Sequence, residues 1–316
     1  MPIDTFSAES AQRWALDLAW SLWTELGVSG QRRSHSNVGV DLEPLIVATA
    51  YLSRFDARLR DESMDWCVLN VSYVSSDRLR NFLKTVDENL HQAFGPYSAT
   101  LKKARRVSWP GDGRPFAFSS TRRSVPPDLF RPALVQLRLR AAFGVSGRAE
   151  VLRWLLAQPD HFVGSLELAL KSHYGKDNVA DTLDLLARAG LLQETVMTTA
   201  GNQRVFRLDR QANIVSALID WVKVPQQRWD AVFRVVVRLI EFAQAAPAKP
   251  AVRAVAIQEM LADLQSDLRW LGTFPRLRQG VDAVNQDFDR WAITALQHWA
   301  RRATESSNPT AAGTVS

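Results

Sequence analysis

The 316-residue chain has little cysteine and no long apolar run. Cys67 is its single cysteine, which excludes an intramolecular disulfide and a cysteine-rich zinc or iron–sulfur site. The longest apolar runs have about seven residues, as at 46–52, far fewer than the roughly 20 that span a bilayer. The first ten residues lack the basic and apolar segments of a signal peptide. We therefore expect a soluble, cytoplasmic protein with no membrane partner, and a buried Cys67.

The sequence also lacks the motifs of common catalytic and cofactor sites. Nothing matches a phosphate-binding loop, a dinucleotide-binding turn or a hydrolase nucleophile elbow. No two histidines have a metal-binding spacing, and they are scattered at His35, His91, His161, His173 and His298. We therefore expect no enzymatic activity, no cofactor and no bound metal.

One acidic cluster near residue 60 deserves comparison with a magnesium site. Its carboxylates alternate with arginines four residues away, as in the pairs Asp56–Arg60 and Arg58–Glu62, which is typical of a solvated helix face. We interpret the cluster as structural. Its members are Asp56, Asp61, Glu62 and Asp65.

Glycine is absent and proline nearly so between residues 41 and 94, where apolar residues recur at three- and four-residue steps. This pattern predicts a helical N-terminal domain over residues 1–94. Asp4, Ser7 or Ser10 is expected to cap its first helix, and Ser75 or Ser76 a later one.

The net charge of +6 is concentrated in one region. Residues 95–145 hold ten lysines and arginines against two acidic residues, whereas residues 1–94 are net acidic. Within this region, prolines and glycines at 95–132 predict a basic surface connector that stays outside the core. Its cations either bind a polyanion or belong to a solvated loop that pairs with the acidic N-terminal region. They are Lys102, Lys103, Arg105, Arg106, Arg122 and Arg123.

Residues 133–210 have a more specific pattern. From Glu150 the chain predicts a helix, then two short helices joined by a turn at Gly175, then a hairpin turning at 200–202. Gly190 follows the third helix as a C-terminal cap. Residues 146–210 resemble the winged helix-turn-helix domain of bacterial regulators of the ArsR and MarR kind. The residues that carry the resemblance are 178–180, Leu183, Leu186, 189–191, 201–202 and 205–208.

The resemblance implies that the third helix enters the major groove of double-stranded DNA. Lys176, Asn178 and Thr182 would then lie on its exposed face, and Arg204 of the wing would approach the DNA backbone. The chain departs from the family at Asp177, Asp181 and Asp184, because carboxylates near phosphates weaken binding. Either the basic connector lies beside this helix and supplies the missing phosphate contacts, or the acidic helix binds a protein partner.

Helical periodicity returns at residues 211–304, which we interpret as a C-terminal helical bundle. The small polar residues at 305–316 predict a disordered tail. Arg234 and Arg238 lie one turn apart on an apolar helix, and we expect the C-terminal helices to form a homodimer. The eleven tryptophans are interpreted as core anchors, with a partner interface as the alternative.

The fold class predicted from these patterns is mainly α, with a winged helix-turn-helix flanked by helical N-terminal and C-terminal domains. The function predicted first is that of a DNA-binding transcriptional regulator. The alternative is an antitoxin-like regulatory protein whose acidic winged helix binds another protein.

Overall fold

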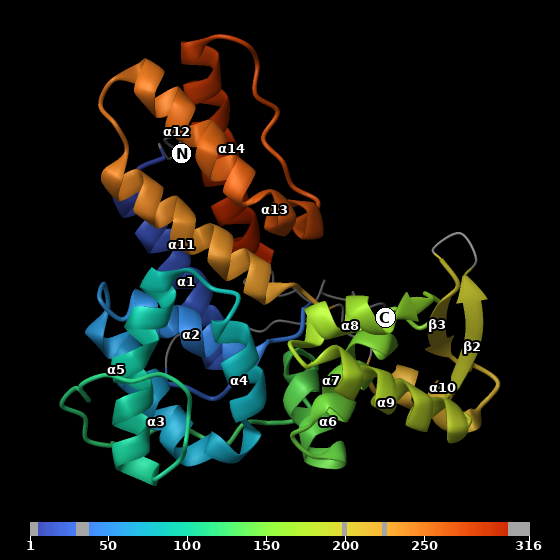
Figure 1. The fold of residues 1–316 in the computed structure, drawn as a ribbon. Coiled ribbons are helices and arrows are strands. Elements are labelled where there is room, and N and C mark those ends of the chain that lie inside the picture. Colours follow the sequence, from blue (N-terminus) through green and yellow to red (C-terminus); the bar gives the residue numbers. More distant parts are fainter. Residues whose placement is uncertain (1–5, 30–37, 198–200, 223–225, 303–316) are drawn as a thin grey trace, which may run out of the picture.

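The computed structural model describes residues 6–29, 38–197, 201–222 and 226–302. They are mainly helical, as predicted, with one small sheet (Figure 1). Within these ranges, no helix has the length and apolarity needed to cross a bilayer. The tail expected at 305–316 lies outside the described residues.

Five helices form the N-terminal part, and polar side chains fix where three of them begin. Ser7 and Ser10 form a reciprocal capping box at the first. Asp56 accepts backbone N–H bonds at the start of the third, and Ser75 accepts the N–H of Arg78 at the start of the fourth. These helices are α1 (Ala8–Glu25), α2 (Leu42–Leu52), α3 (Ala57–Asn70), α4 (Ser76–Leu83) and α5 (Glu88–Arg105).

Helix α5 extends well past the domain boundary predicted at residue 94. It continues through Gly95 and Pro96 to residue 105. A Cβ at residue 95 would lie 2.2 Å from the carbonyl oxygen of Asp112, so glycine allows the connector to cross the helix closely. The helix ends where Arg106 takes a left-handed conformation, with φ of 54°.

The connector that follows, residues 106–131, has no helix or strand but packs on the N-terminal helices. Trp109 is buried and stacks on Phe94, with ring centroids 6.1 Å apart. Asp65 of α3 accepts hydrogen bonds from the backbone N–H groups of Arg122 and Arg123. The expectation that this segment stays outside the core is therefore wrong, because its aromatic side chains complete that core.

The central unit combines helices with the sheet. Its three strands are antiparallel in the order β1-β3-β2, and Val163 pairs with Phe206 while Thr195 pairs with Val205. The predicted hairpin is therefore present. The elements are α6 (Val135–Phe143), α7 (Gly147–Ala157), β1 (Val163–Gly164), α8 (Ser165–Ser172), α9 (Lys176–Arg188), β2 (Leu192–Met197), β3 (Gln203–Leu208) and α10 (Asn213–Trp221).

This unit has its own apolar core. Val179 and Leu183 of α9 pack with Phe206 of β3 and with apolar residues of α7. Val215 of α10 is completely buried in the same core. Helix α10, predicted as part of the C-terminal bundle, therefore belongs to the central unit.

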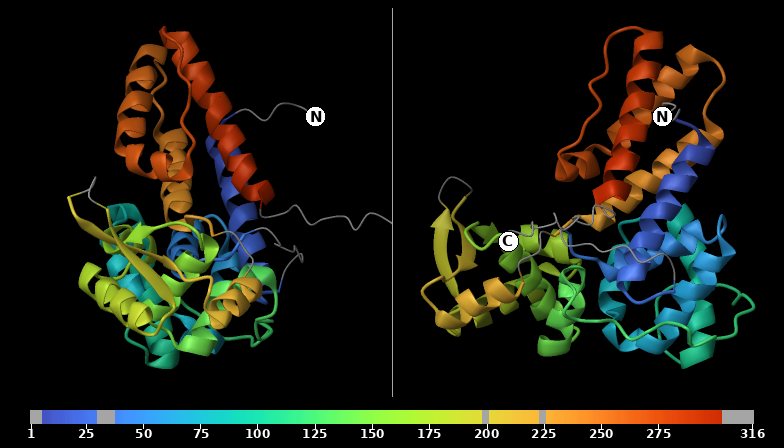
Figure 2. Two further views of the ribbon diagram at one scale, coloured as in Figure 1. Left: turned by 90° about the vertical axis from the view of Figure 1, so that its right-hand side faces the viewer. Right: turned by 180° about the vertical axis from the view of Figure 1, so that it is seen from behind.

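Four helices complete the described chain: α11 (Trp229–Ala245), α12 (Pro250–Asp263), α13 (Gln265–Leu271) and α14 (Val281–Arg302). Helices α11 and α14 pack on α1, so the first and last helices share one core. Phe288 of α14, for example, contacts Phe6 edge to face at a centroid distance of 5.5 Å. Figures 1 and 2 show α12, α13 and α14 above the central unit and helices α2 to α5. The C-terminal bundle is thus continuous with the N-terminal domain.

Buried ions join the N-terminal helices to the central unit. Arg78 of α4 binds the carboxylates of Asp41 and Glu43 at the start of α2. Arg140 of α6 donates to Glu43 at 2.6 Å and to Glu150 of α7 at 2.6 Å. The sixth member is Arg153 of α7, whose Nη2 lies 3.0 Å from both Asp41 and Glu150.

These three arginines and three carboxylates form the buried ion network. Each side chain is at most 2% exposed, so the six charges compensate one another away from water. Burial raises the pKa of Glu150, but the charges of Arg140 and Arg153 outweigh burial and lower it to about 2. The network therefore requires ionised carboxylates.

The first prediction concerns loss of one network charge. Glu150→Gln leaves Arg140 and Arg153 partly uncompensated in the interior, so we expect the free energy of unfolding to fall by about 3–5 kcal/mol. Urea denaturation measures this change. The matched control is Asp77→Asn, which removes the exposed pair with Arg80 and should cost under about 1 kcal/mol. Equal losses in the two variants would contradict a network that carries stability.

The second prediction follows from the pKa of Glu150. This carboxyl has a folded pKa of about 2 against an ordinary value of 4.5, so its contribution is complete above about pH 4.5 and is lost as pH falls toward 2. The stability difference between the wild type and Glu150→Gln should shrink by about 2 kcal/mol between about pH 6 and about pH 3. Parallel pH profiles from urea denaturation would refute this assignment.

Candidate partner-binding site

The outer surface of α9 and the β2–β3 hairpin form one continuous face. A groove of about 520 Å³ runs between α9, the start of α8 and the hairpin. We call this surface the α9–hairpin face. Its charged and amide side chains include Lys176, Asp177, Asn178, Asp181, Asp184, Arg188, Glu194, Asn202, Gln203 and Arg204.

Two residues predicted to read DNA are accessible at the first turn of α9. Lys176 and Asn178 are both exposed. The Oδ1 atom of Asn178 lies close to Gly147, where a Cβ would come within 2.3 Å of it. Glycine at the start of α7 thus lets the two helix ends approach closely.

Thr182 does not lie on the exposed face, contrary to the prediction. Its exposed fraction is 8%, and its hydroxyl donates to the carbonyl oxygen of Asn178 at 2.8 Å. Residue 182 lies between Val179 and Leu186 on the buried side of α9, so it faces the core. Thr182 cannot contact a partner from this position.

Arg204 is on the hairpin as expected, but carboxylates hold its guanidinium. Its Nε lies 2.5 Å from Glu194, and its Nη2 lies 2.7 Å from Asp184 of α9. Hydrogen bonds to Glu194 and Asp184 raise the pKa of Arg204. A phosphate approaching Arg204 would have to compete with both carboxylates.

The α9–hairpin face is acidic and partly apolar. Three cations, Lys176, Arg188 and Arg204, stand beside four carboxylates. Several apolar side chains on and beside the α9–hairpin face are about half exposed. Such a group of exposed apolar side chains is unusual for a surface that contacts only water. These side chains are Leu166, Leu185, Val196 and Met197.

The structure does not bring the connector cations to this face. Figures 1 and 2 place α5 and α9 at opposite ends of the molecule. The cause is packing, since α5 contacts α2 and α3 whereas α9 contacts α7 and α8. The exposed cations of this group are Lys102, Lys103, Arg105, Arg106, Arg122 and Arg123.

One connector arginine outside this group pairs with the N-terminal region. The Nε of Arg131 lies 2.9 Å from the carboxylate of Glu25 at the end of α1. The basic connector is thus held on the N-terminal helices.

The acidic cluster near residue 60 has structural roles. Asp56 caps α3 and accepts the indole N–H of Trp20 at 2.8 Å. Asp65 is buried. Burial raises its pKa, but hydrogen bonds from Ser120 and from the connector backbone outweigh burial, so the pKa of Asp65 lies below its ordinary value. Among the described residues, no group of acidic, histidine or cysteine side chains forms a metal site.

Cys67 is buried as expected, and burial raises the pKa of its thiol to about 12. A thiol with this pKa stays protonated at neutral pH and is a poor nucleophile. Its position therefore fits the interpretation as a small apolar side chain.

The C-terminal helices, expected from the sequence to form a homodimer, contact one another and other helices of the same chain. Arg234 of α11 forms an ion pair with Asp267 of α13, and Arg238 lies 3.4 Å from Glu241. Helix α11 packs on α1 and α2. The polar stripe of α11 thus already has partners in its own chain.

Sequence reasoning missed the buried ion network. Arg140 lies in the run VQLRLRAAF, and Glu150 and Arg153 lie in AEVLRWLLA. Single charges on the apolar side of a helix are the available signal, because an isolated buried charge is unstable without a partner. Periodicity alone does not reveal which elements supply that partner.

A third prediction concerns the connector. Asp65→Ala removes the acceptor for the N–H groups of Arg122 and Arg123, so we expect trypsin to cleave after these residues about fivefold faster. Mass spectrometry of timed digests measures the rate. Asp61→Ala, which removes a half-exposed partner of Arg60, is the control. Unchanged cleavage in Asp65→Ala would show that other contacts hold the connector.

Comparisons with known proteins give no relative that assigns this site. No family model matches the chain, and neither the curated proteins nor the solved structures contain a significant match. The charge, exposure and contacts of the site itself are therefore the observations that bear on function.

Proposed function

We propose that residues 147–208 form a winged helix-turn-helix module. The order helix, strand, helix, helix and hairpin supports this proposal, as does the antiparallel sheet β1-β3-β2. In this interpretation α8 and α9 are the helix-turn-helix, and the β2–β3 hairpin is the wing. The turn between the helices includes His173 in the left-handed conformation, with φ of 56°.

We infer that the chain is a regulatory binding protein without catalytic activity. Its α9–hairpin face binds a basic segment of another protein. The observation that carries this inference is the pairing of Arg204 with Asp184 and Glu194. Asp177 and Asp181 add two exposed carboxylates nearby. Such a face repels phosphates and attracts cationic side chains.

The exposed apolar side chains support the same partner class. Leu166 lines the groove between α8 and the hairpin, and Leu185 lies on the outer side of α9, each 52% exposed. A partner that combines cations with apolar side chains would cover both kinds of group. We therefore propose a basic amphipathic segment.

Duplex DNA is the second candidate. Lys176 and Asn178 favour it, because both are exposed at the first turn of α9, the part of the helix that enters the major groove in the resembling regulators. Asparagine can pair with adenine through two hydrogen bonds. In this case Arg204 exchanges its carboxylates for a phosphate when DNA binds.

The fourth prediction distinguishes the two candidates by fluorescence anisotropy. One probe is a labelled amphipathic peptide of alternating lysine and leucine, and the others are a duplex from upstream of the gene and its scrambled control. We expect the peptide to bind and the double variant Asp177→Asn/Asp181→Asn to weaken it about tenfold, since two attractive charges are lost. Asp160→Asn, which removes the exposed partner of Arg210, should leave binding unchanged.

Three outcomes would overturn the protein-partner proposal. Preferred binding of the upstream duplex, lost in Asn178→Ala, would establish the DNA candidate. Equal binding of both duplexes that disappears at moderate salt and in Arg122→Gln/Arg123→Gln would instead assign polyanion attraction to the connector. Peptide binding that Asp177→Asn/Asp181→Asn leaves unchanged would remove the acidic face as its site.

A further inference from the structure

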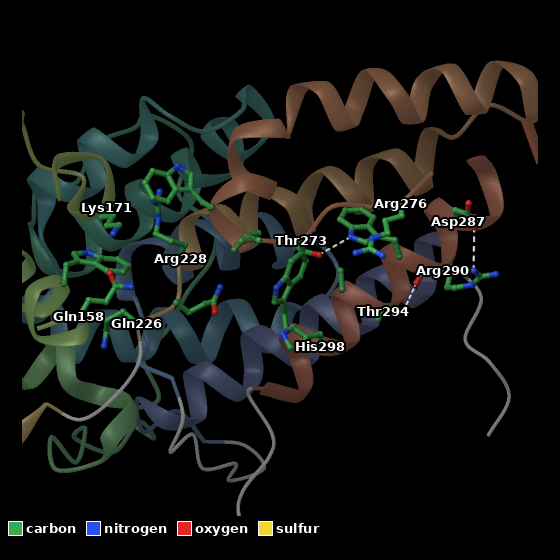
Figure 3. A pocket seen from close by; sticks show the side chains of 18 residues that line it. Gln158, Lys171, Gln226, Arg228, Thr273, Arg276, Asp287, Arg290, Thr294 and His298 are labelled. Atoms are coloured by element: carbon green, nitrogen blue, oxygen red, sulfur yellow. Dashed lines mark hydrogen bonds and ion pairs between the residues drawn. The ribbon is translucent and has the colours of Figure 1, made fainter. Parts of the chain in front are cut away.

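A second cavity lies between the central unit and the C-terminal helices. Its volume is about 830 Å³, within the usual range for small-molecule sites (Figure 3). Its walls come from α7, α8, residues 226–228, α13, residues 272–276 and α14. It shares no lining residue with the groove of the α9–hairpin face, so it is a separate site.

Four tryptophans line this cavity. Trp154 and Trp270 lie at the end nearer α7 and α8, and Trp291 and Trp299 come from α14. The indole of Trp291 is fixed by a hydrogen bond of 3.2 Å to the hydroxyl of Thr273. Indole faces at both ends offer stacking surfaces for a planar ring.

Cations outnumber carboxylates along the same wall. The cationic side chains are those of Lys171, Arg228, Arg276 and Arg290, and the carboxylate is that of Asp287. Arg278 already binds Asp287, at 2.8 Å. Lys171 lies 2.5 Å from Glu167 and Arg290 lies 3.6 Å from Asp287, so the excess positive charge of the lining, which favours an anion, rests on Arg276.

The guanidinium of Arg228 has one nitrogen without an acceptor in the part of the chain that the structure describes. Its exposed fraction is 8%, and its Nε and Nη2 donate to Asp230 at 2.8 Å and 2.7 Å. Its Nη1 is buried and has no hydrogen-bond partner among the described residues. The guanidinium also lies 4.5 Å from the ring centroid of Trp270. One buried guanidinium nitrogen of this lining residue therefore has no acceptor in the described structure.

A second unpaired donor lies at the same end. The Nε1 of Trp154 is buried without an acceptor in the described structure, and this side chain is 9% exposed. The Nζ of Lys171 lies 5.8 Å from the Trp154 ring and 5.7 Å from the Trp270 ring. Three donors and two indoles therefore meet in one part of the cavity, as Figure 3 shows for the labelled Lys171 and Arg228.

We propose that this cavity binds a planar aromatic anion of the nucleoside phosphate class. The phosphate oxygens would accept from Arg228 Nη1 and Lys171 Nζ, and the base would stack on the indoles. An apolar ligand would leave the buried donors of Arg228 and Trp154 unsatisfied. Inorganic phosphate would leave the indoles and most of the 830 Å³ unused.

The ligand would also tie the two cores of the protein together. Trp154 belongs to the core of the central unit, whereas Trp299 belongs to the core shared by the N- and C-terminal helices. A ligand that contacts both sides should raise the melting temperature of the whole chain. This site is independent of the partner proposed for the α9–hairpin face.

The test uses the full chain with adenosine monophosphate, adenosine, inorganic phosphate and indole-3-acetate as probes. Tryptophan fluorescence titration reports binding, and differential scanning fluorimetry reports stability. We expect adenosine monophosphate to quench the fluorescence and to raise Tm by about 5 °C at a hundredfold excess over Kd. The other three probes should bind at least about tenfold more weakly, since each lacks the ring, the anion or the phosphate.

Substitutions of cavity-lining residues test whether adenosine monophosphate binds in this cavity. Lys171→Gln and Arg276→Gln should each weaken adenosine monophosphate about tenfold, whereas Lys249→Gln, an exposed lysine outside the cavity, should have no effect. Trp270→Leu, at a side chain 39% exposed, should reduce both affinity and quenching with little loss of folding. Circular dichroism checks that the variants are folded.

The proposal fails if adenosine monophosphate neither quenches fluorescence nor raises Tm, or if the three cavity variants bind it as the wild type does. Equal affinity for adenosine would refute the role of the cations, and equal affinity for inorganic phosphate would refute the role of the indoles. Equal affinity for indole-3-acetate would refute the assignment of a phosphate.

Discussion

The six charges of the buried ion network fix how the two cores of this protein meet. A guanidinium in the interior is stable only while carboxylates and hydrogen bonds compensate its charge. A shift of the central unit relative to the N-terminal helices would separate opposite charges in a medium of low dielectric, which costs free energy. Arg78 also donates to the carbonyl oxygen of Ser172 at the end of α8, at 2.8 Å. The network therefore reaches the helix pair that presents the α9–hairpin face.

The same region couples helix capping to domain contact. Ser75 caps α4, and its hydroxyl lies 2.8 Å from that of Tyr174, in the turn just before α9. Asp41 precedes α2 but does not cap it, because its carboxylate is committed to Arg78 and Arg153. Local signals and long-range contacts thus compete for the same side chains, and the long-range contact prevails where the site is buried.

That competition explains which features of the fold the sequence predicts. Apolar periodicity and turn residues are local, so they predict most of the helices and the hairpin at 192–208. They do not predict that Glu150 faces Arg140, nor that α11 and α14 pack on α1, because these depend on residues far away in the chain. The sequence does not place Thr182 correctly, because a shift of one position around a helix exchanges an exposed side for a buried one. The charge of the α9–hairpin face, by contrast, is readable from the sequence alone.

The contact between α1 and α14 bears on how the protein is made. Residues 8–25 are synthesised before residues 281–302, which supply part of the surface that covers them. Phe6 cannot pack against Phe288 until residue 288 has been synthesised. The central unit, whose contacts lie within residues 135–222, has no such delay. Synthesis therefore favours an order in which the middle of the chain folds early and the flanking helices close around it last.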